Sequence, residues 1–293
     1  MGENKPTVLI TGSNGLLGSQ LRHVLSQASF SLIATSIGCD RFPLDRHRYI
    51  QLNIESYNEC QSVLNTYKPS IIVNTAAMTN VDACEKNQQK CQSVNADSID
   101  NFIPYVQNNN AHLIQISTDM VFDGKKGGYS EKDICKPINF YGKTKLDAEL
   151  KVLNNITKYT IIRTSMLYDV FGNNFLTWVG NKLKSNEQLS IVDDQYRTPT
   201  YVPDLIAAIL QIIKLKKYGI YHVSSEEKLS IFDIVCSIAN YLHLDSQLIN
   251  RIKSKDLNQF AKRPFDSSLV VKKAKEEFGF SSSKLTHILK QIL

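Results

Sequence analysis

Residues 7–18 read TVLITGSNGLLG, a run of strand-forming residues that leads into three glycines spaced by three. The pattern predicts a strand, a tight turn and the start of a helix. Gly12 permits the turn, Gly15 lets the backbone approach a pyrophosphate, and Gly18 lets the helix pack closely against the strand. The free N–H groups of the helix N-terminus would then hold the anion. Because the spacing differs from the commoner G-x-G-x-x-G, it also fits a plain glycine-rich loop of another α/β protein.

The chain has 293 residues, of which 42% are hydrophobic, and a formal charge of +6. This length and composition suit a folded protein with a sizeable core and argue against disorder. The positive excess lies in residues 214–293, where lysines are dispersed among apolar positions of helical spacing. That distribution favours a solvated face or an anionic small ligand over nucleic acid or anionic lipid as the partner.

Nothing in the sequence predicts export, a membrane span or a metal site. The N-terminal MGENKP has no basic and then apolar leader, and the longest apolar run, residues 205–213, is too short to cross a bilayer. We therefore expect a cytoplasmic protein. The cysteines form no C-x-x-C pair, which argues against a disulfide framework or a zinc site, so we expect reduced thiols; they are Cys39, Cys60, Cys84, Cys91, Cys135 and Cys236.

Strands and helices alternate along the first part of the chain. We expect further strands at 31–35, 49–54, 70–77, 112–118 and 159–165, and helices at 56–67, 87–108 and 139–153. Such alternation predicts right-handed crossovers and a doubly wound parallel sheet of the Rossmann type. Ligands of these sheets bind beyond the carboxyl ends of the strands. We assign residues 1–165 to a dinucleotide-binding domain.

The alternation weakens after residue 165. We expect helices at 173–184 and 203–215, strands at 189–192 and 219–223, and mostly helices from 230 to 293 with a loop at Arg263-Pro264. We assign residues 166–293 to a smaller substrate-binding lobe, interleaved with the last elements of the sheet.

Tyr141 and Lys145 stand four apart at the start of an expected helix, so their side chains share one face. A lysine ammonium within ~4–6 Å of a phenol favours the phenolate and makes it a better acid–base group near neutral pH. Ser117-Thr118-Asp119 ends the strand that precedes this helix. Alone, these residues fit an exposed helical pair and a strand-end turn. In this order after the glycine turn, they favour carbonyl reduction, in which a hydroxyl binds the carbonyl that the tyrosine protonates.

Further motifs are spread over the whole chain: NTAAMTNVD (74–82), ISTDMVFDG (116–124), YGKTKLDAE (141–149), RTSMLY (163–168), GNNF (172–175), DDQYRTPT (193–200) and KRPFDSSL (262–269). With them, the chain resembles the extended short-chain dehydrogenase/reductases, and within these the dTDP-4-dehydrorhamnose reductases.

The resemblance implies a site residue by residue. The catalytic set would be Thr118, Tyr141 and Lys145. The cofactor, NADPH or NADH, would contact Gly12, Ser13, Asn14, Gly15, Leu16, Leu17, Gly18, Ser36, Asn53, Ile54, Ala76, Ala77, Thr79 and Lys145. The sugar nucleotide would contact Thr118, Asp119, Met120, Met166, Asn174 and Arg263, with Asp119 facing the sugar and Arg263 near the diphosphate.

The sequence departs from the family pattern at three positions. Met120 and Met166 replace two aromatic residues that line the sugar pocket in the family, and Asn53 replaces a common acid near the adenine. Both methionines also fit simple core packing. These three departures leave the residues for hydride transfer unchanged, but they leave open which sugar the protein binds.

The resemblance implies NAD(P)H-dependent reduction of the C4 keto group of a nucleotide-linked 6-deoxyhexose, with dTDP-4-dehydro-L-rhamnose as the expected substrate. A homodimer is a candidate assembly. A nucleotide-sugar dehydratase is disfavoured because Met120 stands where that enzyme needs a glutamate. A cofactor-binding regulatory subunit, resembling the reductase-like partner of methionine adenosyltransferase, stays open. The retained Thr118, Tyr141 and Lys145 favour catalysis.

Overall fold

The computed structural model describes residues 5–43 and 47–291, so residues 1–4 of the N-terminal stretch and the last two residues lie outside it. The chain divides into two compact units, each built from three segments. Unit 1 comprises Met1–Ser117, Phe140–Ile162 and Lys216–Ile220. Unit 2 comprises Thr118–Asn139, Arg163–Leu215 and Tyr221–Leu293. The functional division into residues 1–165 and 166–293 stays a prediction.

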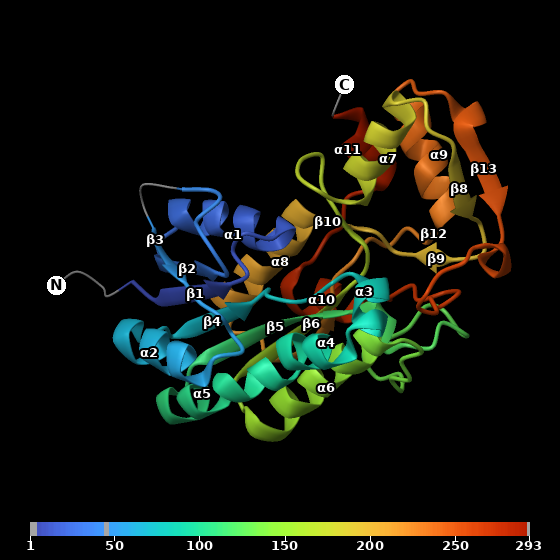
Figure 1. Cartoon of the computed structure of the whole chain (residues 1–293). Helices are drawn as coiled ribbons and strands as arrows, with labels where there is room; N and C mark the ends of the chain where they lie inside the picture. Colours follow the sequence, from blue (N-terminus) through green and yellow to red (C-terminus); the bar gives the residue numbers. More distant parts are fainter. Residues whose placement is uncertain (1–4, 44–46, 292–293) are drawn as a thin grey trace. The chain divides into compact units, whose positions relative to one another are not determined.

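A seven-stranded sheet has the strand order β11-β6-β5-β4-β1-β2-β3 (Figure 1). The strands are β1 (Thr7–Thr11), β2 (Ser31–Ser36), β3 (Arg48–Gln51), β4 (Ile71–Asn74), β5 (His112–Thr118), β6 (Tyr159–Thr164) and β11 (Gly219–His222). β1 pairs in parallel with both β2 and β4, and the β2–β3 and β4–β5 pairs are also parallel. The chain therefore adds strands on one side of β1 and then on the other. The predicted doubly wound parallel sheet is confirmed, and its strand order reverses between β1 and β4.

Helices of unit 1 cover this sheet and close its core. They are α1 (Leu16–Gln27), α2 (Tyr57–Tyr67), α3 (Val81–Lys86), α4 (Gln88–Asn95), α5 (Ile103–Asn109) and α6 (Phe140–Asn155), with a 3₁₀ turn η1 at Asp97–Asn101. Figure 1 shows α2, α4, α5 and α6 along one face of the sheet and α1 on the other. Buried side chains of α2, α5 and α6 pack with those of the strands, among them Leu64, Val106 and Val152. This packing fixes α6, the helix on which the catalytic pair is predicted.

The single helix predicted over 87–108 is wrong. The structure divides it into α4, η1 and α5, and Pro104 lies in the first turn of α5. Proline has no N–H and its ring collides with the carbonyl four residues earlier, so a helix cannot continue through it. Helix α3 is a further element that the sequence analysis did not predict. Its N-terminus is capped by the Asn80 side chain, which accepts from Ala83 N at 2.9 Å.

Unit 2 contains short strand pairs and several helices. The strand pairs are β7 (Leu167–Tyr168) with β10 (Thr200–Tyr201), β8 (Leu189–Val192) with β13 (Ile249–Ile252), and β9 (Tyr196–Arg197) with β12 (Leu229–Ser230). The helices are α7 (Phe175–Lys184), α8 (Val202–Leu215), α9 (Ile231–Tyr241), α10 (Lys272–Phe278) and α11 (Leu285–Lys290), with 3₁₀ turns η2 (Asp119–Val121), η3 (Ser246–Leu248) and η4 (Ser254–Asp256). Buried residues of α7, α9, α11 and β8 form its core.

The expectation of mostly helices from 230 to 293, with a loop around Arg263-Pro264, missed one strand: the structure has helices α9, α10 and α11, two 3₁₀ turns and the expected loop, but also β13. Strand β13 pairs in parallel with β8, Ile249 opposite Leu189, and residues 257–271 contain no helix. Tertiary pairing with a strand sixty residues earlier decides the conformation here, and local sequence does not report such a partner. Within the part of the chain that the structure describes, no helix has the length and apolar character needed to cross a membrane.

Candidate active site

The glycine turn follows β1 and lies against the segment that follows β4. Gly12 has φ +66°, in the left-handed region, and a Cβ built on it would lie 2.7 Å from Ala76 N. A Cβ on Gly18 would overlap the carbonyl oxygen of Gly12, so α1 lies too close to the turn for a larger residue. Both glycines are therefore required by the backbone. Gly12 permits the turn, as predicted, and Gly18 lets the helix pack closely against the turn that follows β1, where close packing against the strand was predicted.

Helix α1 begins at Leu16 with Gly15 as its N-cap, and no side chain caps it. Its first turn carries no acidic residue. The Ser13 hydroxyl is buried without a hydrogen-bond partner among the described residues. Uncapped N–H groups, a buried free hydroxyl and a turn with glycine at each end fit the pyrophosphate of a dinucleotide.

Hydrogen bonds between neighbouring strand ends hold the turn in place. Thr11 Oγ1 donates to Asn74 Oδ1 at 2.5 Å, and Asn74 Nδ2 donates to Gln115 Oε1 at 2.7 Å. Thr75 Oγ1 donates to Thr11 O at 2.6 Å. The ends of β1 and β4 are thus linked to each other and to the middle of β5, and Ala76 and Ala77 come directly after these linked residues of β4 in the chain.

The predicted adenosine side lies at the ends of β2 and β3. Leu52 N donates to Ser36 O at 3.0 Å, which places Ser36 beside the segment that contains Asn53 and Ile54. Ile54 is buried, and Asn53 Oδ1 accepts from Glu55 N at 3.1 Å. The structure therefore brings three predicted cofactor residues together at one edge of unit 1.

The loop after β2 carries an ion pair that the sequence analysis missed. Arg22 of α1 is fully buried and binds Asp40 through two hydrogen bonds of 2.8 Å. The Arg22 guanidinium holds the pKa of Asp40 below its usual value. Asn14, predicted to contact the cofactor, donates to Cys39 O at 2.9 Å in the same loop. The only feature of the sequence that could have indicated this ion pair was Arg22 itself, a single arginine among the apolar positions of the first helix.

Tyr141 and Lys145 lie on α6, as predicted. Tyr141 is half-buried in the first turn, and Lys145, one turn later, is 3% exposed. Burial lowers the pKa of Lys145 to about 8, and the charge of Glu149 opposes that shift. A lysine whose pKa lies near the working pH, one helical turn from a tyrosine, is suited to tuning acid–base chemistry.

Glu149 is a further buried residue of this helix that the sequence analysis did not single out. It stands four residues after Lys145, which places it on the same face of α6. Ser117 Oγ donates to Glu149 Oε1 at 2.5 Å, which joins the end of β5 to α6. Glu149 could have been found from the sequence, because the four-residue spacing that identified Tyr141 and Lys145 continues from Lys145 to Glu149.

Asn95 of α4 joins the segment after β4 to α6. Met78 N donates to Asn95 Oδ1 at 2.8 Å, and Asn95 Nδ2 lies 3.2 Å from Thr144 Oγ1, the residue before Lys145. Asn95 Nδ2 also lies 3.2 Å from Cys91 Sγ. A hydrogen bond with the Cys84 thiol lowers the pKa of Cys91. The predicted nicotinamide side, which ends at the exposed Thr79, is thereby linked to α6.

In unit 2, Thr118 and Asp119 are both buried. Thr118 Oγ1 donates to Asp119 Oδ1 at 3.0 Å and accepts from Met120 N at 3.2 Å. Asp119 Oδ2 accepts from Ser165 Oγ at 2.9 Å and from Ser267 Oγ. The carboxylate is thus surrounded by donors of its own chain.

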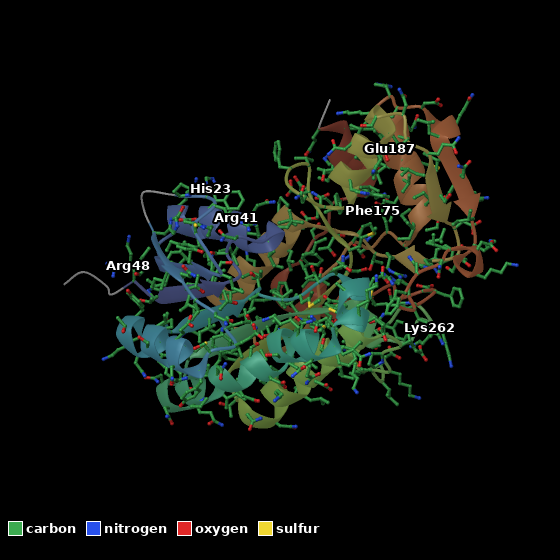
Figure 2. The ribbon with its side chains drawn as sticks, viewed as in Figure 1. His23, Arg41, Arg48, Phe175, Glu187 and Lys262 are labelled. Carbon is green, nitrogen blue, oxygen red and sulfur yellow. The ribbon has the colours of Figure 1, made fainter. Side chains whose placement is uncertain are left out.

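Two other predicted substrate residues lie around the segment 262–269. Asn139 Nδ2 donates to Lys262 O at 2.9 Å and lies 3.6 Å from Met120 Sδ. Figure 2 shows Lys262 on a loop of unit 2, and Arg263 is the next residue in the chain. Arg263 Nη1 donates to Ala261 O at 2.6 Å. Met120 and Arg263 are therefore both placed near Lys262.

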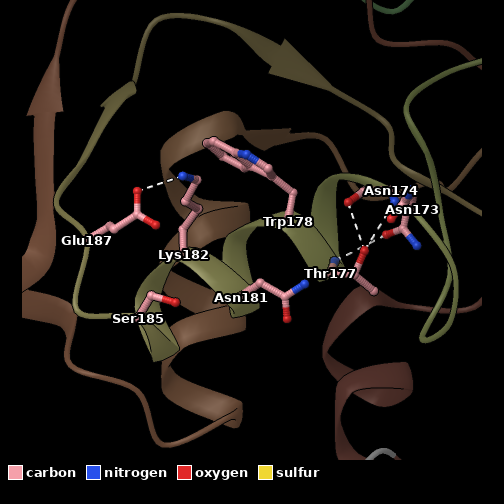
Figure 3. A pocket seen from close by; sticks show the side chains of 8 residues that line it. All are labelled: Asn173, Asn174, Thr177, Trp178, Asn181, Lys182, Ser185 and Glu187. Carbon is pink, nitrogen blue, oxygen red and sulfur yellow. Dashed lines mark hydrogen bonds and ion pairs between the residues drawn. The ribbon is translucent and has the colours of Figure 1, made fainter.

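Met166 and Asn174 lie elsewhere in unit 2. Met166 has φ +41°, a left-handed conformation that is uncommon for a side chain of this size. Asn174 caps α7, accepting from Leu176 N at 3.0 Å, and lies at one end of a surface pocket along that helix (Figure 3). The pocket is otherwise lined by Asn173, Thr177, Trp178, Asn181, Lys182, Ser185 and Glu187. The substrate roles of both residues stay predictions.

No cluster of three or more His, Cys, Asp or Glu side chains within residues 5–43 and 47–291 could hold a metal ion.

The profile of the family described as RmlD substrate binding domain matches residues 6–293. A crystal structure of dTDP-4-dehydrorhamnose reductase from Bacillus anthracis in complex with NADP is 32% identical, has a TM-score of 0.88 and aligns over 98% of each chain.

Two similar curated proteins carry different names. dTDP-4-dehydrorhamnose reductase of Aggregatibacter actinomycetemcomitans is 32% identical over 97% of each chain. Methionine adenosyltransferase 2 subunit beta of Pongo abelii is 30% identical over 89% of this chain and 79% of its own length.

Proposed function

Because the profile match spans residues 6–293, the protein belongs to the RmlD substrate binding domain family, and we propose that it is an NAD(P)H-dependent oxidoreductase of nucleotide sugars. The specific reaction that we propose is reduction of the C4 keto group of dTDP-4-dehydro-L-rhamnose to give dTDP-L-rhamnose. The observation that carries this proposal is the pair on α6, a half-buried Tyr141 one turn from a buried Lys145. The glycine turn of unit 1 supplies a matching place for the cofactor.

The cofactor, when bound, supplies the hydride that is added to C4. Tyr141 donates the proton that the forming alkoxide needs, and Thr118 holds the same oxygen by a hydrogen bond. Lys145, while protonated, favours the tyrosine phenolate and so lowers the cost of proton transfer. Lys145 would also bind the nicotinamide ribose of the bound cofactor. Glu149, four residues further along α6, supports the ammonium charge of this lysine.

The remaining predicted residues hold the two ligands. Residues 12–18 and the N-terminus of α1 would hold the pyrophosphate of the cofactor, Ser36, Asn53 and Ile54 its adenosine, and residues 76–79 its nicotinamide. Met120, Met166 and Asn174 contact the sugar. Arg263 binds the diphosphate, for which a guanidinium offers paired donors.

NADPH should be accepted at least as well as NADH. An NAD-selective site places a free carboxylate on the ribose 2′-hydroxyl after the second strand. Here β2 ends at Thr35-Ser36, and the nearest acid, Asp40, is already bound by Arg22. Steady-state kinetics with both cofactors checks this, and a strong preference for NADH would contradict it.

A second candidate function is a cofactor-binding regulatory subunit, which the similarity to methionine adenosyltransferase 2 subunit beta supports. The two functions differ in turnover. dTDP-, GDP- and UDP-linked 4-keto-6-deoxy sugars are offered with NADPH, and the absorbance of the cofactor is followed. Oxidation with the dTDP sugar supports the reductase, whereas binding of NADPH without oxidation in any mixture supports the regulatory subunit.

A homodimer and a cytoplasmic location also belong to the proposal, and sedimentation and cell fractionation test them.

A further inference from the structure

The Asp119 carboxylate forms hydrogen bonds with side chains from three segments of unit 2. It is 2% exposed, and its carboxylate accepts hydrogen bonds from the hydroxyls of Thr118, Ser165 and Ser267. Ser165 follows β6, and Ser267 lies 148 positions further along the chain than Asp119. A carboxylate can only accept hydrogen bonds, so each hydroxyl must point its proton at Asp119.

Arg197 balances the charge of this buried carboxylate. Arg197 Nε lies 3.8 Å from Asp119 Oδ2, and both side chains are almost fully buried. Arg197 Nη1 also donates to Tyr196 O at 2.7 Å, which holds the guanidinium in place. A buried charge is tolerated where it is paired and hydrogen-bonded, as it is here.

One consequence concerns Thr118. A hydroxyl has a single proton, and that of Thr118 is directed at Asp119 while its oxygen accepts from Met120 N. These two bonds hold the Thr118 oxygen in one place at the end of β5, the position from which it is proposed to bind the sugar oxygen. Because that sugar oxygen can only accept, the Thr118 proton must turn from Asp119 to the sugar oxygen when the substrate binds.

The other consequence concerns the segment 262–269, which carries Arg263. Ser267 joins this segment to Asp119, and two backbone bonds hold it further: Asp266 N donates to Gly124 O at 2.9 Å, and Tyr196 N donates to Phe265 O at 2.6 Å. Asp119 is thus connected to the segment that carries the proposed diphosphate-binding residue and to the proposed sugar-binding hydroxyl.

We propose that Asp119 is a positioning residue, which holds both Thr118 and, through Ser267, the segment of Arg263 in the arrangement that receives the nucleotide diphosphate sugar. This rests on the proposed function. It differs from the expectation that Asp119 faces the sugar, because Asp119 acts here through other residues. Preorganised contacts of this kind raise affinity by removing the cost of ordering the site on binding.

The test uses dTDP, a ligand that lacks the sugar. Affinity for dTDP is measured by calorimetry for the wild type, Asp119→Asn, Ser267→Ala and the control Ser224→Ala. Ser224 is a buried serine of the same unit whose hydroxyl donates to Ser225 O at 3.2 Å, so its variant reports the general effect of removing a buried hydroxyl. Ser267→Ala is the milder change, so the affinity for dTDP can still be compared with that of the wild type if Asp119→Asn does not fold.

We expect Ser267→Ala to weaken dTDP binding about tenfold, in the range for loss of one hydrogen bond to a charged group, and Ser224→Ala to leave it unchanged. In the double variant, the losses of dTDP affinity caused by Asp119→Asn and by Ser267→Ala should not add, because both substitutions break the same hydrogen bond. Unchanged dTDP affinity in both single variants overturns the proposal, since a direct sugar contact would leave dTDP binding intact. So does a wild type that does not bind dTDP. A wild type that binds dTDP but never oxidises NADPH refutes the reductase instead.

Discussion

Replacing Gly12 by alanine tests whether the turn after β1 is built for close approach of the backbone. Gly12 has φ +66° and Gly279, the C-cap of α10, has φ +69°, so alanine meets the same left-handed strain at both positions, roughly 1–2 kcal/mol. The surroundings differ. Nothing lies within 4 Å of a Cβ on Gly279, whereas a Cβ on Gly12 would lie 2.7 Å from Ala76 N and 3.0 Å from Thr75 C.

The additional overlap at Gly12 involves backbone atoms, which cannot rotate away. Overpacking of this kind costs roughly 1–3 kcal/mol, so Gly12→Ala should lose about 2–5 kcal/mol of unfolding free energy and Gly279→Ala only about 1–2 kcal/mol. Displacement of the segment at Ala76 should also weaken NADPH binding by tenfold or more, a change of about 1.4 kcal/mol. Gly279→Ala should leave NADPH binding unchanged.

Urea unfolding followed by circular dichroism gives the first quantity, and the fluorescence of NADPH on titration gives the second. Equal losses of stability in the two variants would show that the contact with Ala76 is not tight. NADPH affinity that is unaffected by Gly12→Ala would refute the assignment of this turn to the cofactor.

Three further predictions concern the chemistry, the sugar pocket and acid stability. Tyr141→Phe should lower kcat about 10²–10⁴-fold and leave the Kd for NADPH unchanged, since it removes only the proposed proton donor; a kcat above about a tenth of wild type would exclude that role. Met120→Tyr and Met166→Trp should change the KM for the sugar nucleotide without changing NADPH affinity; a lowered Tm with unchanged KM would instead indicate core packing, with a loss of about 1–3 kcal/mol. Burial lowers the pKa of His112 from 6.5 to about 4, so between these pH values the unfolded chain binds a proton that the folded chain does not, and stability should fall by up to about 3 kcal/mol as the pH is lowered across this range. Urea titrations should show a shallower loss in His112→Gln, and an equal loss in both proteins would contradict the prediction.

Local patterns in the sequence were sufficient for the elements whose structure is decided locally. The glycine spacing at 12–18 and the four-residue spacing of Tyr141 and Lys145 each encode a backbone geometry, and the structure contains both. The alternation of strands and helices was likewise enough to predict the parallel sheet.

What the sequence did not reveal depends on partners far along the chain. Arg22 binds Asp40, and Ser117 binds Glu149 across 32 positions. Strand β13 exists because β8 lies beside it. No periodicity marks such contacts, since each requires the fold to be formed first. The break at Pro104 was different, because the residue that prevents a continuous helix was visible and its effect on the run from 87 to 108 was overlooked.

The central claim, that the protein reduces a 4-keto sugar nucleotide with Tyr141 as the proton donor, is tested most directly by one measurement. Purified wild-type protein and Tyr141→Phe are incubated with NADPH and dTDP-4-dehydro-L-rhamnose, and NADPH consumed is compared with dTDP-L-rhamnose formed. We predict equal amounts of both in the wild type and almost none in Tyr141→Phe, although both proteins bind NADPH. Binding of NADPH by the wild type without consumption or product would contradict the claim.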